Sequence, residues 1–584
     1  MQTTNNLFSF FSSRRSIQQK SSVAFVVAAA ASQIIKSAYP LTFVPGAKQR
    51  NISTQSSTGA FRLPPKKCNT RHHNVFMPSC QMSTGRCENR GERTELEEGM
   101  TLDALAICNA AIRQADPALA VNSHLSYSEG GEAVNLLDSS TGKTHSYKIN
   151  DFDEIMIFAF GKASVSMAAT TADILRPSQL RMKGVVITKD GHGKQEELES
   201  LAGIQVEYAS HPIPDARCIT AAKDLISIIS RANNRTLIIN CISGGGSALF
   251  CSPREGLSLK DMEETNNQLL ASGMPITDIN VIRKRLEVGK GGGLAGLSYP
   301  ATSLTMVLSD VIGDPLDLIA SGPTVADEST FEDAWNLVLK YRLDSEFTLP
   351  ETVLDLLQRG RAGLLDNDDS PDRDHPVFTT GSPSSITNSF LSETVLVGNN
   401  LLAVQAAANE ARCRGYNPIV LSAKIEGEAR HISHAYISMA EQLQYQRTNP
   451  KLSICPISEL PAALIAGGET TVTLSQDCGK GGRNQEIGLA ASLKMHSTGL
   501  RNIVLASVGT DGTDGPTDAA GAVVDGGTID RVEIQNNGNM LGESALANHD
   551  AYNFFSGSKE ELKPLIKTGP TGSNVADVCV TLIK

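Results

Sequence analysis

The chain has 584 residues, 40% of them hydrophobic, which is enough material for more than one buried core. Its eleven Cys form no CxxC pair and show no His/Cys ligand spacing, which argues against a structural zinc site and a small secreted disulfide scaffold. The formal charge of -11, without a basic stripe or zinc finger, disfavours nucleic-acid binding.

Charge is distributed unevenly along the chain, and this unevenness marks a leader. Of 52 Lys and Arg, eleven precede Glu88 while no Asp or Glu does, so the remainder carries 41 basic against 63 acidic residues, a net charge of -22. An acid-free, Ser-rich, Arg-containing start is typical of an organelle targeting sequence. The apolar run Val23 to Ala31 is too short to span a bilayer. We expect residues 1–95 to be a disordered, cleaved leader for a mitochondrion or plastid, with a basic extension that has no targeting role as the alternative and the cytoplasm less favoured.

Beyond the leader, short β-branched runs alternate with longer helical patterns. Apolar spacing predicts a first amphipathic helix from Thr101 to near Asp116. Strands are then expected at 154–160, 184–188, 204–210, 236–242, 303–308, 394–397, 418–422, 462–466, 503–508 and 577–582. Helices are expected at 164–175, 219–232, 258–272, 400–414 and 484–495. This alternation predicts an α/β protein with mostly parallel sheets covered by helices on both faces. No later segment approaches ~20 uninterrupted apolar residues, so no membrane insertion of the mature protein is expected.

A polar stretch divides the body of the chain into two portions. Residues 361–392 include Asp366 to Pro371 and Gly381 to Ser385, which are too polar to bury and indicate a linker or insertion. We therefore expect one α/β domain over residues 100–360 and another over 393–584. A cleft between two such domains is a common place for a small-molecule site.

One glycine-rich turn follows the predicted strand that ends at Ile242. Gly244, Gly245, Gly246 and Ser247 would present backbone N–H groups to an anion, so they are predicted to form a phosphate cradle rather than a plain tight turn.

Acidic and basic candidates follow other predicted strands. Asp310 and Asp314 lie four residues apart just past a strand and are the predicted Mg²⁺ ligands; the alternative is an Asx-turn. Lys162 lies at a strand-to-helix turn that is similar to the end of a Walker A loop. Met156 stands where that motif requires Gly, so no P-loop is predicted, and Lys162 is either a point charge for a phosphoryl group or a solvated side chain.

The remaining candidates come from three further segments. His211 and Asp215 end another strand and supply an acid, a base or a substrate ligand, with a satisfied loop histidine as the alternative. Arg483 and its neighbour Asn484 begin a helix after a glycine-rich loop, a way to hold a guanidinium against an oxyanion. The acidic turn Thr510 to Asp518, with Asp511 and Asp514, binds a ligand or is a solvated connection; EF-hand spacing is absent.

The segment Gly291 to Gly296 satisfies the GxGxxG pattern, but the residues before it, Ile282 to Val288, read as a helix. A dinucleotide fold requires a strand there, so no NAD fingerprint is predicted.

Taken in order, these loops resemble the class II glycerate kinase family, the glycerate 2-kinases with a C-terminal MOFRL domain. The resemblance covers nearly all of residues 100–584 and is carried by 160–163, 210–215, 243–249, 309–323 and the three C-terminal loops, 479–486, 510–518 and 569–574. It implies two Rossmann-like α/β/α domains with the active site between them. It also implies ATP- and Mg²⁺-dependent phosphoryl transfer to the 2-hydroxyl of D-glycerate, giving 2-phosphoglycerate and ADP.

Carried over by motif, Lys162 and Arg483 look like the family's catalytic cations, and Asp310 with Asp314 like metal or hydroxyl contacts. Substrate or nucleotide contacts are expected from Gly244, Gly245, Gly246, Ser247, His211, Asp215, Lys290, Asn484, Asp511 and Asp514. Which loop holds the nucleotide and which the glycerate stays open, as does a homo-oligomeric state. Glu287 to Gly289 departs from the Ser-x-Ile-Lys-Gly-Gly pattern usual in the family. Two rival functions remain, a hydroxypyruvate reductase and a non-catalytic phosphometabolite-binding protein.

Overall fold

The computed structural model describes residues 93–584 except 366–371, 380, 382–390, 450–458, 476, 539 and 559–562. The predicted leader up to residue 92 and most of the predicted polar linker lie outside the described residues. The predicted division into domains therefore stays a prediction.

The first described element is the helix α2, Glu95–Gln114, which begins earlier than the sequence pattern predicts. Thr94 caps it, because its hydroxyl accepts a hydrogen bond from Glu97 N (3.2 Å) while the Glu97 carboxylate accepts one from Thr94 N (3.1 Å). Arg93 donates a 2.8 Å hydrogen bond to the buried Asp525. Folded structure therefore includes Arg93 and Thr94, which the sequence analysis assigned to the leader.

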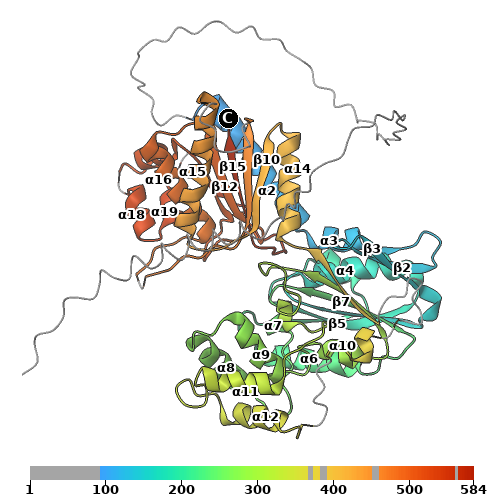
Figure 1. The fold of residues 1–584 in the computed structure, drawn as a ribbon. Coiled ribbons are helices and arrows are strands. Elements are labelled where there is room, and N and C mark those ends of the chain that lie inside the picture. Colours follow the sequence, from blue (N-terminus) through green and yellow to red (C-terminus); the bar gives the residue numbers. More distant parts are fainter. Residues whose placement is uncertain are drawn as a thin grey trace, which may run out of the picture. The chain divides into compact units, whose positions relative to one another are not determined.

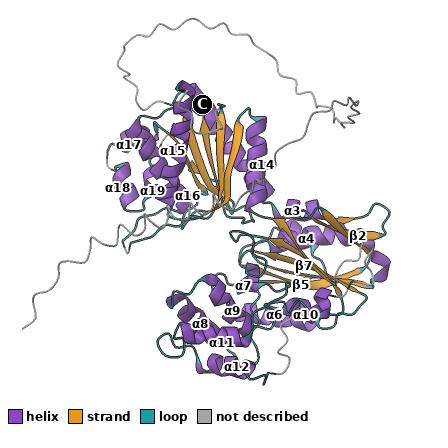
Figure 2. Ribbon diagram, in the orientation of Figure 1, coloured by secondary structure: helices purple, strands orange, loops and turns teal. Residues whose placement is uncertain are grey.

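A small antiparallel sheet follows that the sequence analysis did not predict. After α3 (Pro117–His124), the strands pair in the order β1-β2-β3, and Figure 2 shows this sheet beside α3. Its strands are β1 Leu125–Tyr127, β2 Ala133–Asp138 and β3 Lys143–Lys148. They are short and only partly buried, so they lack the long β-branched runs by which the other strands were recognised.

The first large sheet has six strands in the order β6-β5-β4-β7-β8-β9, and every neighbouring pair is parallel. Its strands are β4 Glu154–Phe160, β5 Arg181–Lys189, β6 Gln205–Ala209, β7 Thr236–Ser243, β8 Thr302–Leu308 and β9 Ser392–Gly398. The prediction of a parallel sheet is confirmed here. β9 pairs with β8, although the sequence-based division places it in the C-terminal portion. The polypeptide thus returns to this sheet after residue 361 before it enters the second one.

Side-chain alternation along β4 explains why helices cover both faces of this sheet. Ile155, Ile157 and Ala159 pack in one core together with residues of α4 (Ser164–Leu175). Met156, Phe158 and Phe160 pack in another core with α6 (Ala216–Ile229). Successive side chains point to opposite faces of a strand, so a run that is apolar at every position requires a cover on each face. The short helices α5 Gln195–Ser200, α7 Gly246–Leu249 and α10 Gly293–Ser298 complete the connections.

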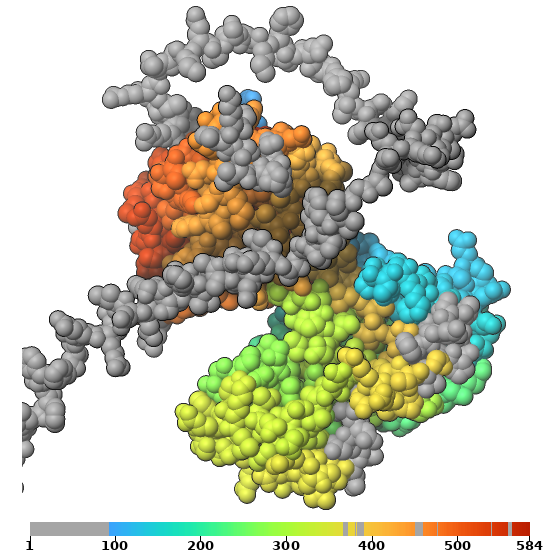
Figure 3. Space-filling model, viewed as in Figure 1, coloured from blue at the N-terminus to red at the C-terminus, as the bar shows by residue number. Residues whose placement is uncertain are grey.

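Four helices inserted between β7 and β9 form a compact cluster of their own (Figure 2). They are α8 Leu259–Ala271, α9 Ile276–Leu286, α11 Phe331–Lys340 and α12 Glu351–Arg361, and the short α13, Pro376–Thr379, follows. In Figure 3 this cluster is the green to yellow-green part of the surface. It carries α9, which provides one wall of the cavity described below.

The second large sheet is mixed, in the order β10-β11-β15-β12-β13-β14, and the expectation of a mostly parallel sheet is wrong here. Only β10 and β11 pair in parallel, and the other four pairs are antiparallel. Two of the antiparallel pairs arise from the last strand, β15, which starts where β11 and β12 end and runs back between them. The other two arise because β13 runs antiparallel to β12 and to β14. The strands are β10 Asn417–Ile425, β11 Ala462–Gly468, β12 Ile503–Gly509, β13 Gly521–Asp525, β14 Leu565–Ile566 and β15 Asp577–Ile583.

Helices cover both faces of the second sheet (Figure 1). α2 and α14, Asn400–Cys413, pack on one face, whose core includes Ala463, Ile465 and Val504. The other face carries α15 Ala429–Thr448, α16 Arg483–Thr498, α17 Thr528–Gln535, α18 Gly542–Ala547 and α19 Ala551–Ser556. The α/β class is therefore confirmed for both sheets. Among residues 93–584, apart from the undescribed gaps, no helix has the length and apolarity to cross a bilayer.

Candidate active site

The turns after β4 and β7 are locked together at the carboxyl ends of their strands. Gly161 has a φ of 126°, and a Cβ there would overlap the backbone and hydroxyl of Ser243. Lys162 N donates to Gly244 O (2.9 Å), and Ala163 N donates to Ser243 Oγ (3.0 Å). Only glycine permits this approach, so the two turns fix Lys162 beside the glycine loop.

The loop of three glycines has no room for side chains. A Cβ on Gly244 would overlap the carboxylate of Asp310. Gly245 has a φ of 83°, and a Cβ there would lie 2.8 Å from His211 Nε2. The glycines are therefore required by close neighbours, and they bring Asp310 and His211 to the predicted cradle.

His211 lies in a cationic environment. Burial, together with the positive charges of Lys162, Lys189 and His192, lowers the pKa of its imidazole to about 4. His211 is consequently neutral near pH 7, where it offers hydrogen bonds rather than charge.

The two predicted metal ligands have different partners. Asp310 Oδ2 accepts a 3.2 Å hydrogen bond from Asn574 Nδ2, and burial raises the pKa of its carboxyl although Lys162 lowers it. Asp314 accepts a 2.7 Å hydrogen bond from Asn399 Nδ2. Within the part of the chain that the structure describes, no group of three or more His, Cys, Asp or Glu residues is placed to hold a metal. Mg²⁺ at Asp310 and Asp314 therefore stays a prediction.

Arg483, the first residue of α16, forms ion pairs with two carboxylates. Its Nε and Nη2 donate to the two oxygens of Asp577 at 2.5 and 2.9 Å, and its Nη1 lies 3.2 Å from Glu469 Oε1. Burial acts to lower the pKa of the guanidinium, but Asp577 and Glu469 outweigh it and raise that pKa. The guanidinium is charged and oriented, with 30% of its side chain exposed.

Glu469 lies within range of charges from both large sheets: Lys162 and Asp310 follow strands of the first, and Arg483 and Asp577 belong to elements of the second. Burial raises the pKa of its carboxyl, Arg483 and Lys162 lower it, and Asp577 and Asp310 raise it. Four charges therefore act on Glu469, and together with it they form what we call the charge cluster: Lys162, Asp310, Glu469, Arg483 and Asp577.

Sequence reasoning missed Glu469 and Asp577 as site residues. Glu469 follows the predicted strand 462–466 just as Asp310 follows its strand, so the same signal was present. Asp577 opens the last strand, and nothing in the sequence indicates that this strand starts, rather than ends, at the site edge.

Asp514 and Asn484 serve the local fold. The Asp514 carboxylate accepts hydrogen bonds from Asn484 N (3.1 Å) and Gln485 N (2.9 Å), so it caps α16. Burial raises its pKa to about 6. The Asn484 amide accepts a 2.6 Å hydrogen bond from Ser507 Oγ. Both side chains are buried, and their predicted ligand contacts stay predictions.

Four further predicted residues have these places. Asp215 caps α6 and pairs with Arg217, which lowers the Asp215 pKa against burial. Asp511 Oδ1 accepts a 3.0 Å hydrogen bond from Thr513 N, and its charge acts on Asp310. Lys290 and Ser247 both line a cavity described next.

Two cavities open beside these loops, one at the glycine loop after β7 and one at the glycine-rich loop before α16. One, of about 200 Å³, is lined by polar and charged side chains that include His211, Ser247 and Lys290. The other, of about 430 Å³, lies at the start of α16 and is lined by Arg483, Glu469 and the glycines 479, 481 and 482, with Val472 and Leu474.

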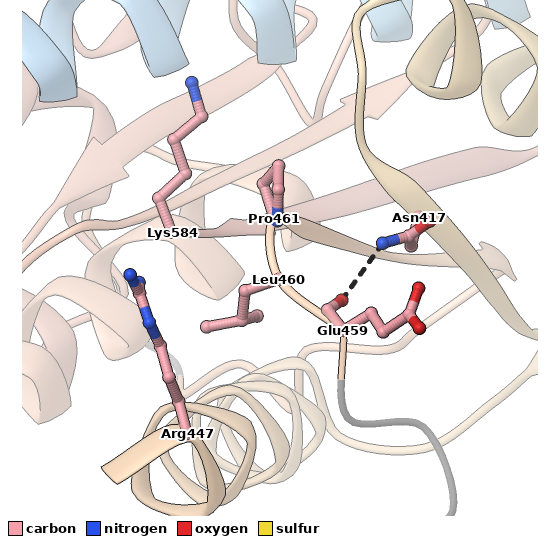
Figure 4. A pocket seen from close by; sticks show the side chains of 6 residues that line it. All are labelled: Asn417, Arg447, Glu459, Leu460, Pro461 and Lys584. Atoms are coloured by element: carbon pink, nitrogen blue, oxygen red, sulfur yellow. Dashed lines mark hydrogen bonds between the residues drawn. The ribbon is translucent and has the colours of Figure 1, made fainter.

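A third pocket lies at the opposite ends of the strands of the second sheet (Figure 4). It is lined by Asn417 at the start of β10, Pro461 just before β11, and Lys584 after β15, with Arg447 from α15. Asn417 Nδ2 donates to Glu459 O at 3.2 Å. The carboxylate of Asp577 lies at the other end of β15, so this pocket is separate from the charge cluster.

A parallel sheet whose carboxyl-end turns carry glycines, a lysine and carboxylates defines an α/β protein with a site for a small anionic ligand. Comparison with known proteins makes this more specific. The family described as "Domain of unknown function (DUF4147)" matches residues 103–358, and the MOFRL family matches residues 462–577.

Individual relatives cover most of the chain. A Pyrococcus horikoshii protein named glycerate 2-kinase is 36% identical over 479 residues, covering 82% of this chain and 96% of the relative. An Agrobacterium vitis protein with the provisional name hydroxypyruvate reductase is 35% identical and covers 73% of this chain and 99% of its own. The crystal structure of glycerate kinase from Thermotoga maritima matches with a TM-score of 0.66 at 32% identity, covering 83% of this chain and 100% of that one. The chain belongs to the glycerate kinase family, and the resemblance seen in its loops is confirmed.

Proposed function

We propose that this protein transfers the γ-phosphoryl group of ATP to the 2-hydroxyl of D-glycerate, producing 2-phosphoglycerate and ADP. Family membership supports phosphoryl transfer to glycerate, and the name of the Pyrococcus relative supports the 2-hydroxyl. The observation that carries the proposal is the charge cluster, in which Lys162 from the first sheet and Arg483 from the second act on the same carboxyl, Glu469.

The chemistry asked of these residues is mainly electrostatic. A transferring phosphoryl group spreads negative charge over its oxygens, and positioned cations and backbone N–H groups stabilise that charge. Lys162 supplies a point charge next to the glycine loop, and Arg483 supplies a planar fork held by Asp577. Because Asp577 and Glu469 already fix the guanidinium, little reorganisation is needed when a phosphate oxygen meets its exposed side.

The acidic side chains around the two cations fit a divalent metal. The charges of Asp310, Glu469 and Asp577 act with those of Lys162 and Arg483, and Asp511 adds a further negative charge near Asp310 and Asp577, so the ionised groups have an excess of negative charge. Burial raises the pKa of Asp310, Glu469 and Asp577, and a nearby cation would relieve this. A Mg²⁺ ion held there would supply positive charge that neutralises the nucleotide's phosphate oxygens. In this proposal Asp310 and neighbouring carboxylates hold it.

The reductase alternative has less support. The glycines 291–296 follow the helix α9 and run into α10, so they do not join a strand to a helix as a dinucleotide fingerprint requires. The provisional name of the Agrobacterium relative nevertheless makes the activity worth measuring.

One set of assays separates the candidates. ADP release is measured with D-glycerate, ATP and Mg²⁺, and NADH consumption is measured with hydroxypyruvate. Phosphorus NMR of the product distinguishes 2-phosphoglycerate from 3-phosphoglycerate. ADP release with the 2-phospho product supports the proposal, whereas NADH consumption alone, or the 3-phospho product, would contradict it.

We also propose organellar import of the protein, on the acid-free composition of residues 1–87. Fusing residues 1–95 to a fluorescent protein tests this, because import and shortening of the fusion are expected. Diffuse cytoplasmic fluorescence at full length would contradict it.

A further inference from the structure

Part of the wall of the cavity of about 200 Å³ is formed by residues that belong neither to the sequence motifs nor to the charge cluster. His211 and Gly245 line one part of it. The helices α8 and α9 line another part through Asn266 and Arg283. The cavity is smaller than the pockets of roughly 300–1,000 Å³ that hold drug-sized ligands, so it suits a small metabolite better than a nucleotide.

Arg283 is one of three consecutive basic residues in the last turn of α9, and it differs from the other two. Lys284 Nζ lies 3.3 Å from Asp327, and Arg285 forms a closer ion pair with the same carboxylate. Arg283 Nε donates to the neutral amide oxygen of Asn266 at 2.8 Å. Among the residues that the structure describes, no carboxylate lies within ion-pair distance of Arg283.

The Arg283 guanidinium is thus a largely buried charge without a counterion. Burial lowers its pKa, and the charge of Glu287 offsets this only in part. A buried cation that lacks a partner destabilises the fold, unless a ligand supplies the missing charge.

Glu287 is committed elsewhere. It lies 2.5 Å from Lys290 Nζ, and its other oxygen accepts a 2.9 Å hydrogen bond from Ser252 N. Lys290 also donates to Ser247 O at 3.0 Å. Lys290 and Glu287 therefore neutralise each other and His211 is neutral, so Arg283 leaves the cavity with one net positive charge.

We propose that Arg283 binds the carboxylate of the acceptor acid in this cavity. The inference rests on the proposed function and deepens it, because it assigns the acid to this cavity and leaves the larger one at α16 for the nucleotide. A guanidinium matches a carboxylate with two parallel hydrogen bonds, which fixes orientation as well as charge. With the carboxylate at α9, the acceptor's hydroxyls extend toward Gly245, and a Cβ at Gly245 would lie 3.5 Å from Lys162 Cγ. This orientation directs the acceptor hydroxyl toward the glycine loop that Lys162 adjoins.

The primary test replaces Arg283 and measures the two substrates separately. Arg283→Gln removes the charge, Arg283→Lys retains it, and the exposed Arg181→Gln is the matched control. For Arg283→Gln we expect the KM for D-glycerate to rise roughly 10- to 100-fold, as for loss of a hydrogen bond to a charged group. The KM for ATP and the kcat should stay within about threefold, and Arg283→Lys should recover part of the loss. An unchanged KM for D-glycerate, or an equal rise for ATP, would overturn the inference.

Asn266→Asp provides a second, near-isosteric test. It places a carboxylate where Arg283 Nε already donates, so the new acid should compete with the substrate and raise the KM for D-glycerate. A purely structural Arg283 would instead gain a partner, which would raise the Tm without changing that KM; this result would contradict the proposal.

Acceptor analogues and direct binding distinguish a failure of the proposed function from a failure of the Arg283 assignment. The natural enzyme should prefer D-glycerate over its uncharged amide, and Arg283→Gln should lose most of that preference. If the natural enzyme phosphorylates neither compound, the proposed function fails. If it phosphorylates D-glycerate and Arg283→Gln keeps the preference, only the Arg283 assignment fails. Calorimetric titration with D-glycerate reports the same loss of affinity without turnover.

Discussion

Asn574 donates a 3.2 Å hydrogen bond from its side-chain amide to Asp310 Oδ2, which lies 264 residues earlier in the chain. Asp310 follows β8 of the first sheet, and Asn574 precedes β15 of the second. The contact joins the two groups of loops that supply Lys162 and Arg483, and it helps to keep the buried Asp310 ionised.

Replacing Asn574 tests this contact. Asn574→Ala should lower kcat by about 10-fold, because Asp310 loses a donor to its charged form and becomes less well positioned. The pH at which activity falls on the acid side should move upward, since the hydrogen bond lowers the Asp310 pKa. The pH profile of kcat measures both effects. An unchanged profile would show that the contact does not matter to catalysis.

The two cations should dominate turnover. Lys162→Ala and Arg483→Ala are each expected to reduce kcat by at least ~10²-fold, the effect of losing one donor to a transition-state charge. Steady-state kinetics measures this, with the exposed Lys143→Ala and Arg181→Ala as controls.

Arg483→Ala also leaves the buried Asp577 without its partner and therefore needs a conservative companion. Arg483→Lys keeps the charge but loses the two-pronged geometry, and it should still reduce kcat strongly. Near-normal turnover in Lys162→Ala or in Arg483→Lys would contradict the assigned roles, provided the circular dichroism spectrum is unchanged.

A single methyl group at Gly244 should disable the site. Gly244→Ala would place its Cβ on the Asp310 carboxylate, so either the loop or Asp310 must move. A displacement of about 1 Å at a reacting centre reduces turnover by as much as about 10²-fold. Gly99→Ala is the matched control, because it lies in α2 with no atom within 4 Å of the added Cβ. That control should keep full activity and gain up to about 1 kcal/mol of stability.

Asp514 predicts a pH dependence of stability. Burial raises its folded pKa from 3.8 to about 6, so the folded state holds this proton more tightly than the unfolded chain does. The free energy of unfolding should therefore fall as pH rises from about 4 to 6, by up to about 3 kcal/mol from this group, and then level off. Urea unfolding of the natural protein and of Asp514→Asn across this range measures it. The free energy of unfolding of the natural protein minus that of Asp514→Asn should decrease as pH rises from about 4 to 6. An increase in this quantity would contradict the assigned shift.

Local pattern was sufficient for most of the elements around the site. The predicted strand 154–160 coincides with β4, and the predicted helix 164–175 coincides with α4, because the apolar periodicity that indicates each element lies within its own short segment. Loops that follow strands were marked as places for chemistry, since carboxyl ends of parallel strands share an edge, and the ligand contacts of these loops stay predictions. Glu469 shows the limit of that rule. It follows a predicted strand, but it was overlooked because other loops contain more Gly, Ser, Thr and Asp.

Three features depended on contacts between distant residues. The strand β15 carries the same apolar pattern whichever way it runs, so its antiparallel insertion between β11 and β12 follows only from where the preceding loop is held. Asp514 and Asn484 have the composition of ligand contacts, yet they cap and brace α16. Arg283, Lys284 and Arg285 are indistinguishable in sequence, and only the tertiary structure gives acids to two of them.

By itself the sequence determined the α/β class, the position of most strands and helices, and the family resemblance, and it singled out Lys162 and Arg483 as the predicted cations, because each is encoded in short contiguous patterns. The tertiary structure decided which carboxylates hold Arg483, which cavity carries the unpaired Arg283, and which way the last strand runs. Those properties arise from pairing between segments hundreds of residues apart, and electrostatic and packing energies depend on distances in space that no local pattern contains.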